Sequence, residues 1–184
     1  MEALAASVTG QWKEVGEARP TVNVPGQDNF IVWTPRGGGI VMVDEGASPE
    51  ALAGMLFGTI VAGNGAVVCV PSHLRALAGL LVDALHEAGV SQYALFLAEA
   101  DATPDSLAAL PVHFAVADLG AEGTASLHRA LSVTSEDGGQ RWLKALVSMS
   151  DGTRPGEPCF LWRLCHAKTV AVSTLRHGAD LDLL

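Results

Sequence analysis

The stretch PRGGGIVMVDEGASPEALAGMLFGTIVAGNGAVVCVP, residues 35–71, decides the fold of this chain. Residues 40–43 are apolar and largely β-branched, which predicts a buried strand. Ser48-Pro49-Glu50 then supplies an N-cap, a proline at the first helical position and an acid in the first helical turn. The AGNG turn at residues 62–65 ends that helix, and residues 66–70 form the next strand. Together these segments predict a βαβ unit.

The rest of the chain continues the alternation of strands and helices. Further strands are predicted over residues 28–35, 93–97, 112–117 and 144–149. Helices are predicted after an N-cap at Ser72, over residues 105–110 and over residues 120–131. The buried stripe of the first of these helices is predicted to be Leu74, Leu77, Leu81, Ala84, Leu85 and Ala88. Short connections in this order predict an α/β, Rossmann-like fold, with a mainly parallel sheet and helices on both faces.

A different pattern begins at a linker rich in Gly and Pro, over residues 150–158. Two short apolar runs follow it, residues 160–164 and 169–173, and predict an antiparallel β-hairpin, or flap, that stands off the core. The chain then divides into an N-terminal lead-in with an edge strand (1–35), a Rossmann-like core (36–150) and a linker with a C-terminal β-flap (151–184). Because one hairpin alone is barely stable, we expect this flap to reach a partner.

Composition limits the classes of function. The chain has 184 residues, of which 49% are apolar and 17% charged, which suits a parallel sheet buried on both faces. The net charge is −9, and the basic residues are scattered singly, so nucleic-acid binding is not expected. We also expect no membrane insertion, because no uninterrupted apolar stretch is long enough. The N-terminus does not resemble a signal peptide and there are three cysteines, so we expect a cytoplasmic location.

The tryptophans indicate where a partner would bind. They are Trp12, Trp33, Trp142 and Trp162, in a chain with only 5% aromatic residues. Two of them, Trp33 and Trp162, fall in predicted strands outside the core sheet, and tryptophan is enriched at protein contacts. Trp162 packs either on another domain or chain, or over the open end of its own core. The predicted partner contact consists of Phe160, Trp162, Val170 and Val172.

The cysteines and histidines give a weak signal for chemistry. Cys69 lies inside a predicted strand and is expected to be a core residue. In a functional interpretation, a thiol–imidazole pair or a metal site would be formed by Cys159 and Cys165 with His166 and His177. Their spacing matches no standard zinc pattern, and ordinary hairpin-turn and tail positions are the expected interpretation.

Two further segments have a functional and a structural interpretation. Residues 36–39, Arg-Gly-Gly-Gly, resemble a phosphate loop in composition, but they precede a strand and match no nucleotide-binding pattern, which indicates a turn. Asp44-Glu45 follow a core strand, at the edge where doubly wound sheets bind ligands. Two acids would disfavour a dinucleotide phosphate there, so a solvated loop is the expected interpretation.

Three segments in order resemble the aldehyde dehydrogenase superfamily. AGNGAVVCVPSH (62–73) resembles that family's AGN-(T/A)-VVxKPSE, and LVDALHEAGVSQYALFLAEA (81–100) resembles LLxEAGxPxGVxxxVxG. VHFAVADLGAEGTASLHRAL (112–131) stands where the family has its VAFTGS strand and the following helix. Asp28-Asn29, a strand and PRGGGIVMVDE resemble GEDNxxxxxPRGxVLxLG of the proline utilization A (PutA) flavoenzymes. The resemblance is strongest to the degenerate, aldehyde-dehydrogenase-like domain at the C-terminus of long PutA proteins.

This resemblance implies a partner and an architectural role. In long PutA proteins the extra domain is thought to be non-catalytic, with a β-flap that covers a neighbouring catalytic domain. The flap helps to close a cavity for the pyrroline-5-carboxylate/glutamate-semialdehyde intermediate of proline catabolism. For this chain it implies a catalytic aldehyde dehydrogenase domain as partner, in the same polypeptide or as a subunit, and a homo-oligomer is compatible with it.

The departures from the family pattern imply that the chain is not an enzyme by itself. Val70 stands where the family has a lysine that contacts the adenosine ribose, and His73 stands where it has an acid. Asp118-Leu119 fall near the Gly-Ser that faces the cofactor phosphates. Nothing resembles the segments that carry the general base and the nucleophilic cysteine. We therefore predict no catalytic, cofactor-binding or metal-binding residues, and NAD is disfavoured.

Three hypotheses follow from the sequence. The first is a non-catalytic structural domain that packs on a catalytic aldehyde dehydrogenase module and supports assembly and substrate channelling. The second is a regulatory module that keeps NAD(P) affinity. The third is a truncated oxidoreductase of the same superfamily, or a thiol enzyme that uses Cys165 and His166.

Overall fold

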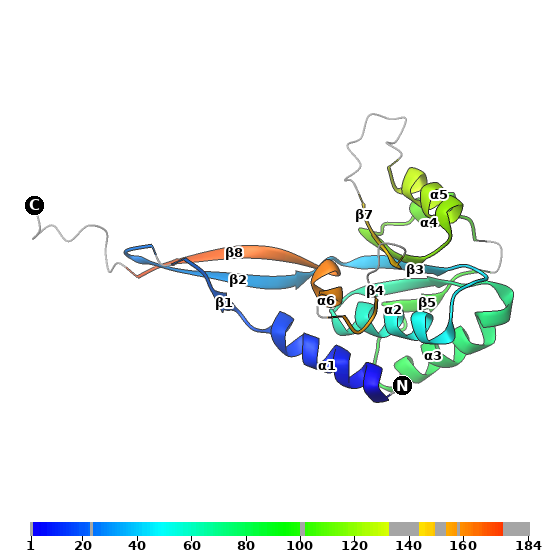
Figure 1. The fold of residues 1–184 in the computed structure, drawn as a ribbon, viewed down its shortest axis with the longest axis horizontal. Helices are drawn as coiled ribbons and strands as arrows, with labels where there is room; N and C mark the ends of the chain where they lie inside the picture. Colours follow the sequence, from blue (N-terminus) through cyan, green and yellow to red (C-terminus); the bar gives the residue numbers. More distant parts are fainter. Residues whose placement is uncertain are drawn as a thin grey trace, which may run out of the picture.

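Two sheets organise the computed structural model, which describes residues 2–22, 24–99, 102–132, 144–149, 154–157 and 159–174. A five-stranded sheet, in the order β5-β4-β3-β6-β7, forms the core, and a three-stranded sheet, β1-β2-β8, forms a ribbon that projects from it (Figure 1). The core strands are β3 (Gly38–Val43), β4 (Gly65–Cys69), β5 (Leu95–Leu97), β6 (Phe114–Asp118) and β7 (Ala145–Ser148). The ribbon strands are β1 (Arg19–Pro20), β2 (Gln27–Pro35) and β8 (Cys165–Ser173).

The core sheet is parallel throughout, as the sequence predicts. Strand β3 lies between β4 and β6, and Ile40 is in register with Val67 on one side and Ala115 on the other. These strands are short runs of apolar residues because both faces of the sheet are covered. Ile40, Val41 and Val116 are completely buried.

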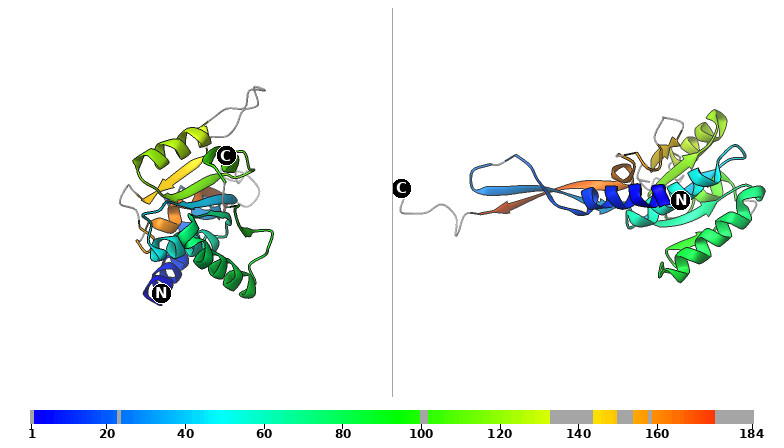
Figure 2. Two further views of the ribbon diagram at one scale, coloured as in Figure 1. Left: turned by 90° about the vertical axis from the view of Figure 1, so that its right-hand side faces the viewer. Right: turned by 60° about the horizontal axis from the view of Figure 1, so that its bottom comes forward.

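Helices cover the two faces unequally (Figure 2). One face carries α1 (Glu2–Gly16), α2 (Pro49–Val61), α3 (Arg75–Glu87) and the short α6 (Phe160–Arg163). The other carries α4 (Pro104–Ala108) and α5 (Ala121–Ser132). Helix α2 begins as predicted, because the Ser48 hydroxyl accepts a hydrogen bond from the amide of Ala51 at 3.1 Å.

The start of α3 differs from the prediction. Ser72 makes no cap, because Ser72–Leu74 form a 3-10 turn and α3 starts only at Arg75, without a side-chain cap. The buried positions are Leu74, Ala78 and Val82. Of the rest of the predicted stripe, Leu77, Leu81 and Leu85 are partly buried against the core, whereas Ala84 and Ala88 are exposed.

The ribbon corrects the predicted hairpin. Residues 160–164 and 169–173 do not pair with each other, because Phe160–Arg163 form helix α6. Cys165–Ser173 form one nine-residue strand that pairs antiparallel with β2, from the N-terminal part of the chain. Phe160, Leu161 and Leu164 are completely buried, at a spacing that suits one face of a helix. The C-terminal β-flap thus exists, but its second strand is β2.

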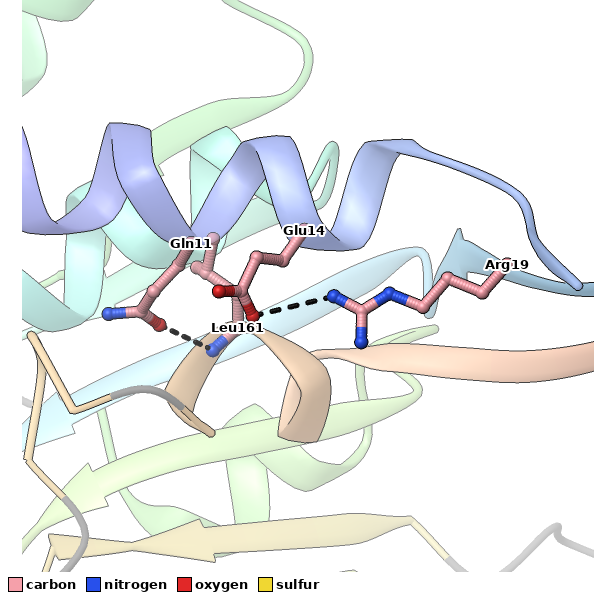
Figure 3. A network of polar contacts seen from close by, with 4 residues as sticks. All are labelled: Gln11, Glu14, Arg19 and Leu161. Carbon is pink, nitrogen blue, oxygen red and sulfur yellow. Dashed lines mark hydrogen bonds and ion pairs between the residues drawn. The ribbon is translucent and has the colours of Figure 1, made fainter.

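Helix α1 holds the root of the ribbon against the core (Figure 3). The buried side chain of Gln11 accepts a hydrogen bond from the amide of Leu161 at 3.3 Å, which fixes the start of α6. Glu14 pairs with Arg19 of β1 at 3.5 Å. This ion pair is exposed and contributes little on its own, but it crosses from α1 to the ribbon.

Candidate functional site

Asp44 lies at the carboxyl edge of the core sheet, where open α/β sheets bind ligands. It follows β3, and its amide donates to the carbonyl of Asp118, the last residue of β6, at 3.1 Å. One carboxylate oxygen accepts from the amide of Gly46 at 2.9 Å, and the other accepts from the amide of Gly120 at 2.6 Å. Asp44 therefore ties the loop after β3 to the start of α5.

The Gly120 amide belongs to the N-terminal end of α5. The Gly120 carbonyl accepts the first hydrogen bond of this helix, from the amide of Thr124 at 2.9 Å. Such helix ends attract anions, because their amides are unpaired and the helix dipole is positive there. In this chain the anion is the carboxylate of Asp44. A dinucleotide phosphate would have to displace that carboxylate to reach the Gly120 amide.

The neighbouring positions that resemble the aldehyde dehydrogenase motifs have other contacts. Val70, where a lysine would contact a ribose, is 7% exposed and belongs to the apolar core. The His73 ring nitrogen Nδ1 lies 2.9 Å from a carboxylate oxygen of Glu45, in an exposed pair. The loop position predicted for Asp44-Glu45 is correct, but the sequence did not reveal the bond from Asp44 to α5. That bond joins residues of two separate βα units.

A wide hollow runs beside α5. Its volume is about 780 Å³, and apolar residues line it together with Gly120, Thr124, His128, Arg129 and Ser148. A second hollow, of about 320 Å³, lies at the opposite end of the strands, with Gly38, Gly39 and Gly65 in its wall and Tyr93 and Phe96 beside them. The residues that line these two hollows include no Asp or Glu.

The Arg-Gly-Gly-Gly segment joins the ribbon to the core. The turn predicted over residues 36–39 is limited to Arg36 and Gly37, because Gly38 and Gly39 already belong to β3. Gly37 needs its glycine because its φ is 108°. The guanidinium Nε of Arg36 donates to the carbonyl of Arg163 at 2.9 Å. Asn64 accepts from the Gly37 amide at 3.0 Å and donates to the Leu164 carbonyl at 2.9 Å. This segment thus connects β2, β3 and α6.

The thiols are not arranged as nucleophiles. Cys165 is 3% exposed, and burial raises the pKa of its thiol, although the charge of Arg36 partly opposes that shift. His166 is the next residue in β8, and successive strand residues point to opposite faces. Burial also raises the pKa of Cys69, against a smaller opposing effect of Arg75. Cys159 is exposed, and His177 lies outside the described residues.

The four residues predicted to contact a partner fall into two groups. Phe160 is completely buried in the core, so its side chain does not reach the surface. Trp162 is partly buried and stacks on Trp33, with ring centroids 5.7 Å apart and planes 5° apart. Val170 and Val172 are 42% and 48% exposed on the ribbon. Trp142 lies outside the described residues.

Among the described residues, no group of three or more His, Cys, Asp or Glu side chains is placed to hold a metal ion. No helix among those residues is long and apolar enough to cross a membrane.

Comparisons with known proteins place the fold. No protein-family model and no curated protein matches the chain. A mutant of PutA from Bradyrhizobium japonicum matches 79% of this chain at 23% identity, with a TM-score of 0.70. PutA from Bdellovibrio bacteriovorus matches the same share at 17% identity, with a TM-score of 0.69. In both cases the match spans 15% of the PutA chain.

Aldehyde dehydrogenases outside PutA match as well. A NAD-dependent benzaldehyde dehydrogenase from Corynebacterium glutamicum matches 79% of this chain at 15% identity, with a TM-score of 0.60, over 31% of its own length. These identities establish a likeness of fold. The chain therefore has an aldehyde-dehydrogenase-like fold, which over 79% of its length resembles part of PutA and of an aldehyde dehydrogenase.

Proposed function

We propose that this chain is a non-catalytic, aldehyde-dehydrogenase-like domain that packs on a catalytic aldehyde dehydrogenase module. The module would be of the pyrroline-5-carboxylate/glutamate-semialdehyde type, in the same polypeptide or as a separate subunit. The domain would support assembly and close a cavity through which the intermediate of proline catabolism passes. The likeness to PutA structures supports this choice of partner.

The projecting ribbon is the observation that carries the proposal. Strands β2 and β8 pair over nine residues and leave the core as a narrow sheet (Figure 1). Val170 and Val172 expose 42% and 48% of their surface there. A two-stranded ribbon is marginally stable in water, and exposed valines on it favour burial against another surface.

The carboxyl edge of the core supports the non-catalytic part of the proposal. Asp44 already satisfies the Gly120 amide at the start of α5, and Val70 offers no polar group to a ribose. The three thiols include two whose pKa is raised by burial, which disfavours the nucleophilic thiolate.

The proposal is tested by mixing the chain with the purified pyrroline-5-carboxylate dehydrogenase of the same organism and following complex formation by sedimentation velocity. We expect a complex that the double variant Val170→Asp/Val172→Asp weakens by about tenfold or more, because the charges must be desolvated. Point substitutions are preferable to deleting residues 158–184, which would remove Phe160 and Leu164 from the core.

The matched control is Leu80→Asp/Tyr93→Asp. Leu80 and Tyr93 are 69% and 87% exposed, on parts of the molecule away from the ribbon. This variant should bind like the unmodified chain. Equal binding by the ribbon variant would contradict the proposal, and failure to form any complex would contradict its form in which the partner is a separate subunit. The same experiment shows whether the chain associates with itself.

A further inference from the structure

A group of basic side chains gathers at the root of the ribbon, although the sequence scatters its basic residues singly. His166 and Lys168 are two residues apart in β8, so they share one face of the strand. Arg36 follows the end of β2, where Pro35 is in register with Cys165. His113 precedes β6, and its ring lies against Gly37. We call these residues the basic cluster: Arg36, His113, His166 and Lys168.

Arg36 and His166 are in direct contact. The guanidinium Nη1 of Arg36 lies 3.5 Å from the ring nitrogen Nδ1 of His166, which can accept a hydrogen bond from it when that nitrogen carries no proton. Burial of the imidazole ring and the positive charges of Arg36, Lys168 and His113 all lower the pKa of His166. His166 is therefore protonated less readily than an isolated histidine, and a bound anion would oppose that effect.

No acid of the described chain neutralises the basic cluster. The protein has 20 acidic and 11 basic residues, so carboxylates are in excess. Yet the ion pairs found among the described residues are Glu14 with Arg19 and Glu45 with His73, and neither includes a member of the cluster. An exposed set of like charges without counter-charges attracts an anionic partner.

The spacing of the charges indicates what kind of anion fits. Residues i and i+2 of a strand are about 7 Å apart, so carboxylates that each face one of His166 and Lys168 would be separated by a similar distance. Carboxylates on an extended polypeptide repeat at the same spacing. The guanidinium of Arg36 presents donors that suit a carboxylate. Val170 and Val172 continue the same strand face beyond Lys168 and provide an apolar surface for the rest of such a segment.

We propose that the basic cluster is a carboxylate-binding site that takes an extended acidic segment of a polypeptide. This proposal does not rest on the proposed function, and because the segment would cover Val170 and Val172, it would compete with a dehydrogenase that packs on those valines. Protonation of His166 strengthens binding, because a bound carboxylate stabilises the imidazolium. Affinity therefore rises as His166 becomes protonated at lower pH, as long as the ligand carboxylates stay ionised.

The test is a titration of the full chain with hexaglutamate at low ionic strength, followed by NMR and fluorescence anisotropy, with hexaglutamine as the neutral peptide. We expect saturable binding of hexaglutamate, with changes in the Arg36 and His166 signals. Lys168→Ala should weaken it by about three- to fivefold. Lys13→Ala removes the same charge from an exposed position on α1 and should leave the affinity unchanged.

Two further arms separate the alternatives. Glutarate at the same carboxylate concentration should bind much more weakly, and equal affinity would overturn the extended segment as the ligand. Hexaglutamate should bind more tightly at about pH 6 than at about pH 8, and His166→Gln should reduce this difference. Equal weakening by Lys13→Ala and Lys168→Ala, or no saturable binding of hexaglutamate, would overturn the proposal.

Discussion

Asp44 shows how one side chain can decide the chemistry of a sheet edge. Its carboxylate accepts from the Gly46 and Gly120 amides, at 2.9 and 2.6 Å. It thereby supplies the negative charge that the start of α5 favours. In a dinucleotide-binding domain, a phosphate would make this contact. The Asp44 carboxylate therefore stabilises the fold at this edge of the core sheet, in the position where a ligand phosphate would otherwise bind.

Asp44→Ala should lower the free energy of unfolding by about 1–2 kcal/mol, because the Gly120 amide loses its acceptor at a helix N-terminus. Urea denaturation measures the change. Glu45→Ala is the matched control, since Glu45 is exposed and pairs only with the exposed His73, and its effect should stay below about 0.5 kcal/mol. Equal losses in the two variants would contradict the role assigned to Asp44.

The three thiols should react at very different rates. Cys159 is exposed, whereas burial raises the pKa of Cys69 and of Cys165, so those two hold less thiolate at a given pH. Titration of the native protein with Ellman's reagent at about pH 8 should show one fast thiol and two slow ones. Cys159→Ser should remove the fast phase. A fast phase that persists in that variant would revive the thiol-enzyme hypothesis for Cys165.

Helix α6 illustrates packing at the element scale. Its Phe160 ring lies directly on Gly58 of α2, and a Cβ at Gly58 would overlap that ring. Phe160 is completely buried, so the ring has no free space into which it could move. Close packing of these two helices thus depends on the absence of a side chain at Gly58.

Gly58→Ala should destabilise the protein by about 1–3 kcal/mol through overpacking. Gly79→Ala, in the middle of α3, should instead stabilise it by about 0.5–1 kcal/mol, because nothing lies within 4 Å of the new Cβ and alanine favours the helix. Thermal unfolding of both variants gives the comparison. Stabilisation by both substitutions would show that helix propensity, rather than the contact with Phe160, decides the outcome.

The root of the ribbon depends on stacked aromatic rings. Trp33 of β2 stacks on Trp162 of α6, and Arg19 of β1 lies 5.4 Å from the centre of the Trp162 ring. Both indole nitrogens are buried without a hydrogen-bond partner in the described chain. The stack therefore contributes through ring contact, and the unpaired N–H groups reduce its benefit.

Trp33→Ala should destabilise the ribbon by about 3 kcal/mol and speed hydrogen exchange in β2 and β8, with little change in β3 and β6. Trp33→Phe should restore most of the protection, because it keeps an aromatic ring and removes an unpaired donor. Hydrogen exchange followed by mass spectrometry resolves the two strands. Uniform loss of protection over the core would show that the stack supports the whole molecule rather than the ribbon.

At the scale of the whole molecule, the fold of the core and the carboxyl edge of its sheet indicate different functions. The core has the strand order of a nucleotide-binding type of domain, and a hollow of about 780 Å³ lies beside α5. The carboxylate of Asp44 opposes a phosphate at that edge. The proposed architectural role and the alternative regulatory role therefore differ in whether the chain binds NAD(P).

Calorimetric titration with NAD+ and NADP+ distinguishes these roles. We expect no saturable heat up to about millimolar ligand. Asp44→Ala is the informative variant, because it removes the charge that opposes the phosphates, and binding that appears only there would confirm the blocking role. Saturable binding by the unmodified chain would instead favour the NAD(P)-binding regulatory module.

The sequence by itself determined the parallel core and its βαβ unit. Helix α2 with its Ser48 cap, and the buried strands β3, β4 and β6, follow from local periodicity and capping, which act between residues a few positions apart. Only the tertiary structure decided that β8 pairs with β2, that Asp44 caps α5, and that the basic cluster exists. Each of these joins segments far apart in the chain, and local patterns carry no information about which distant partner a strand or a charge will meet.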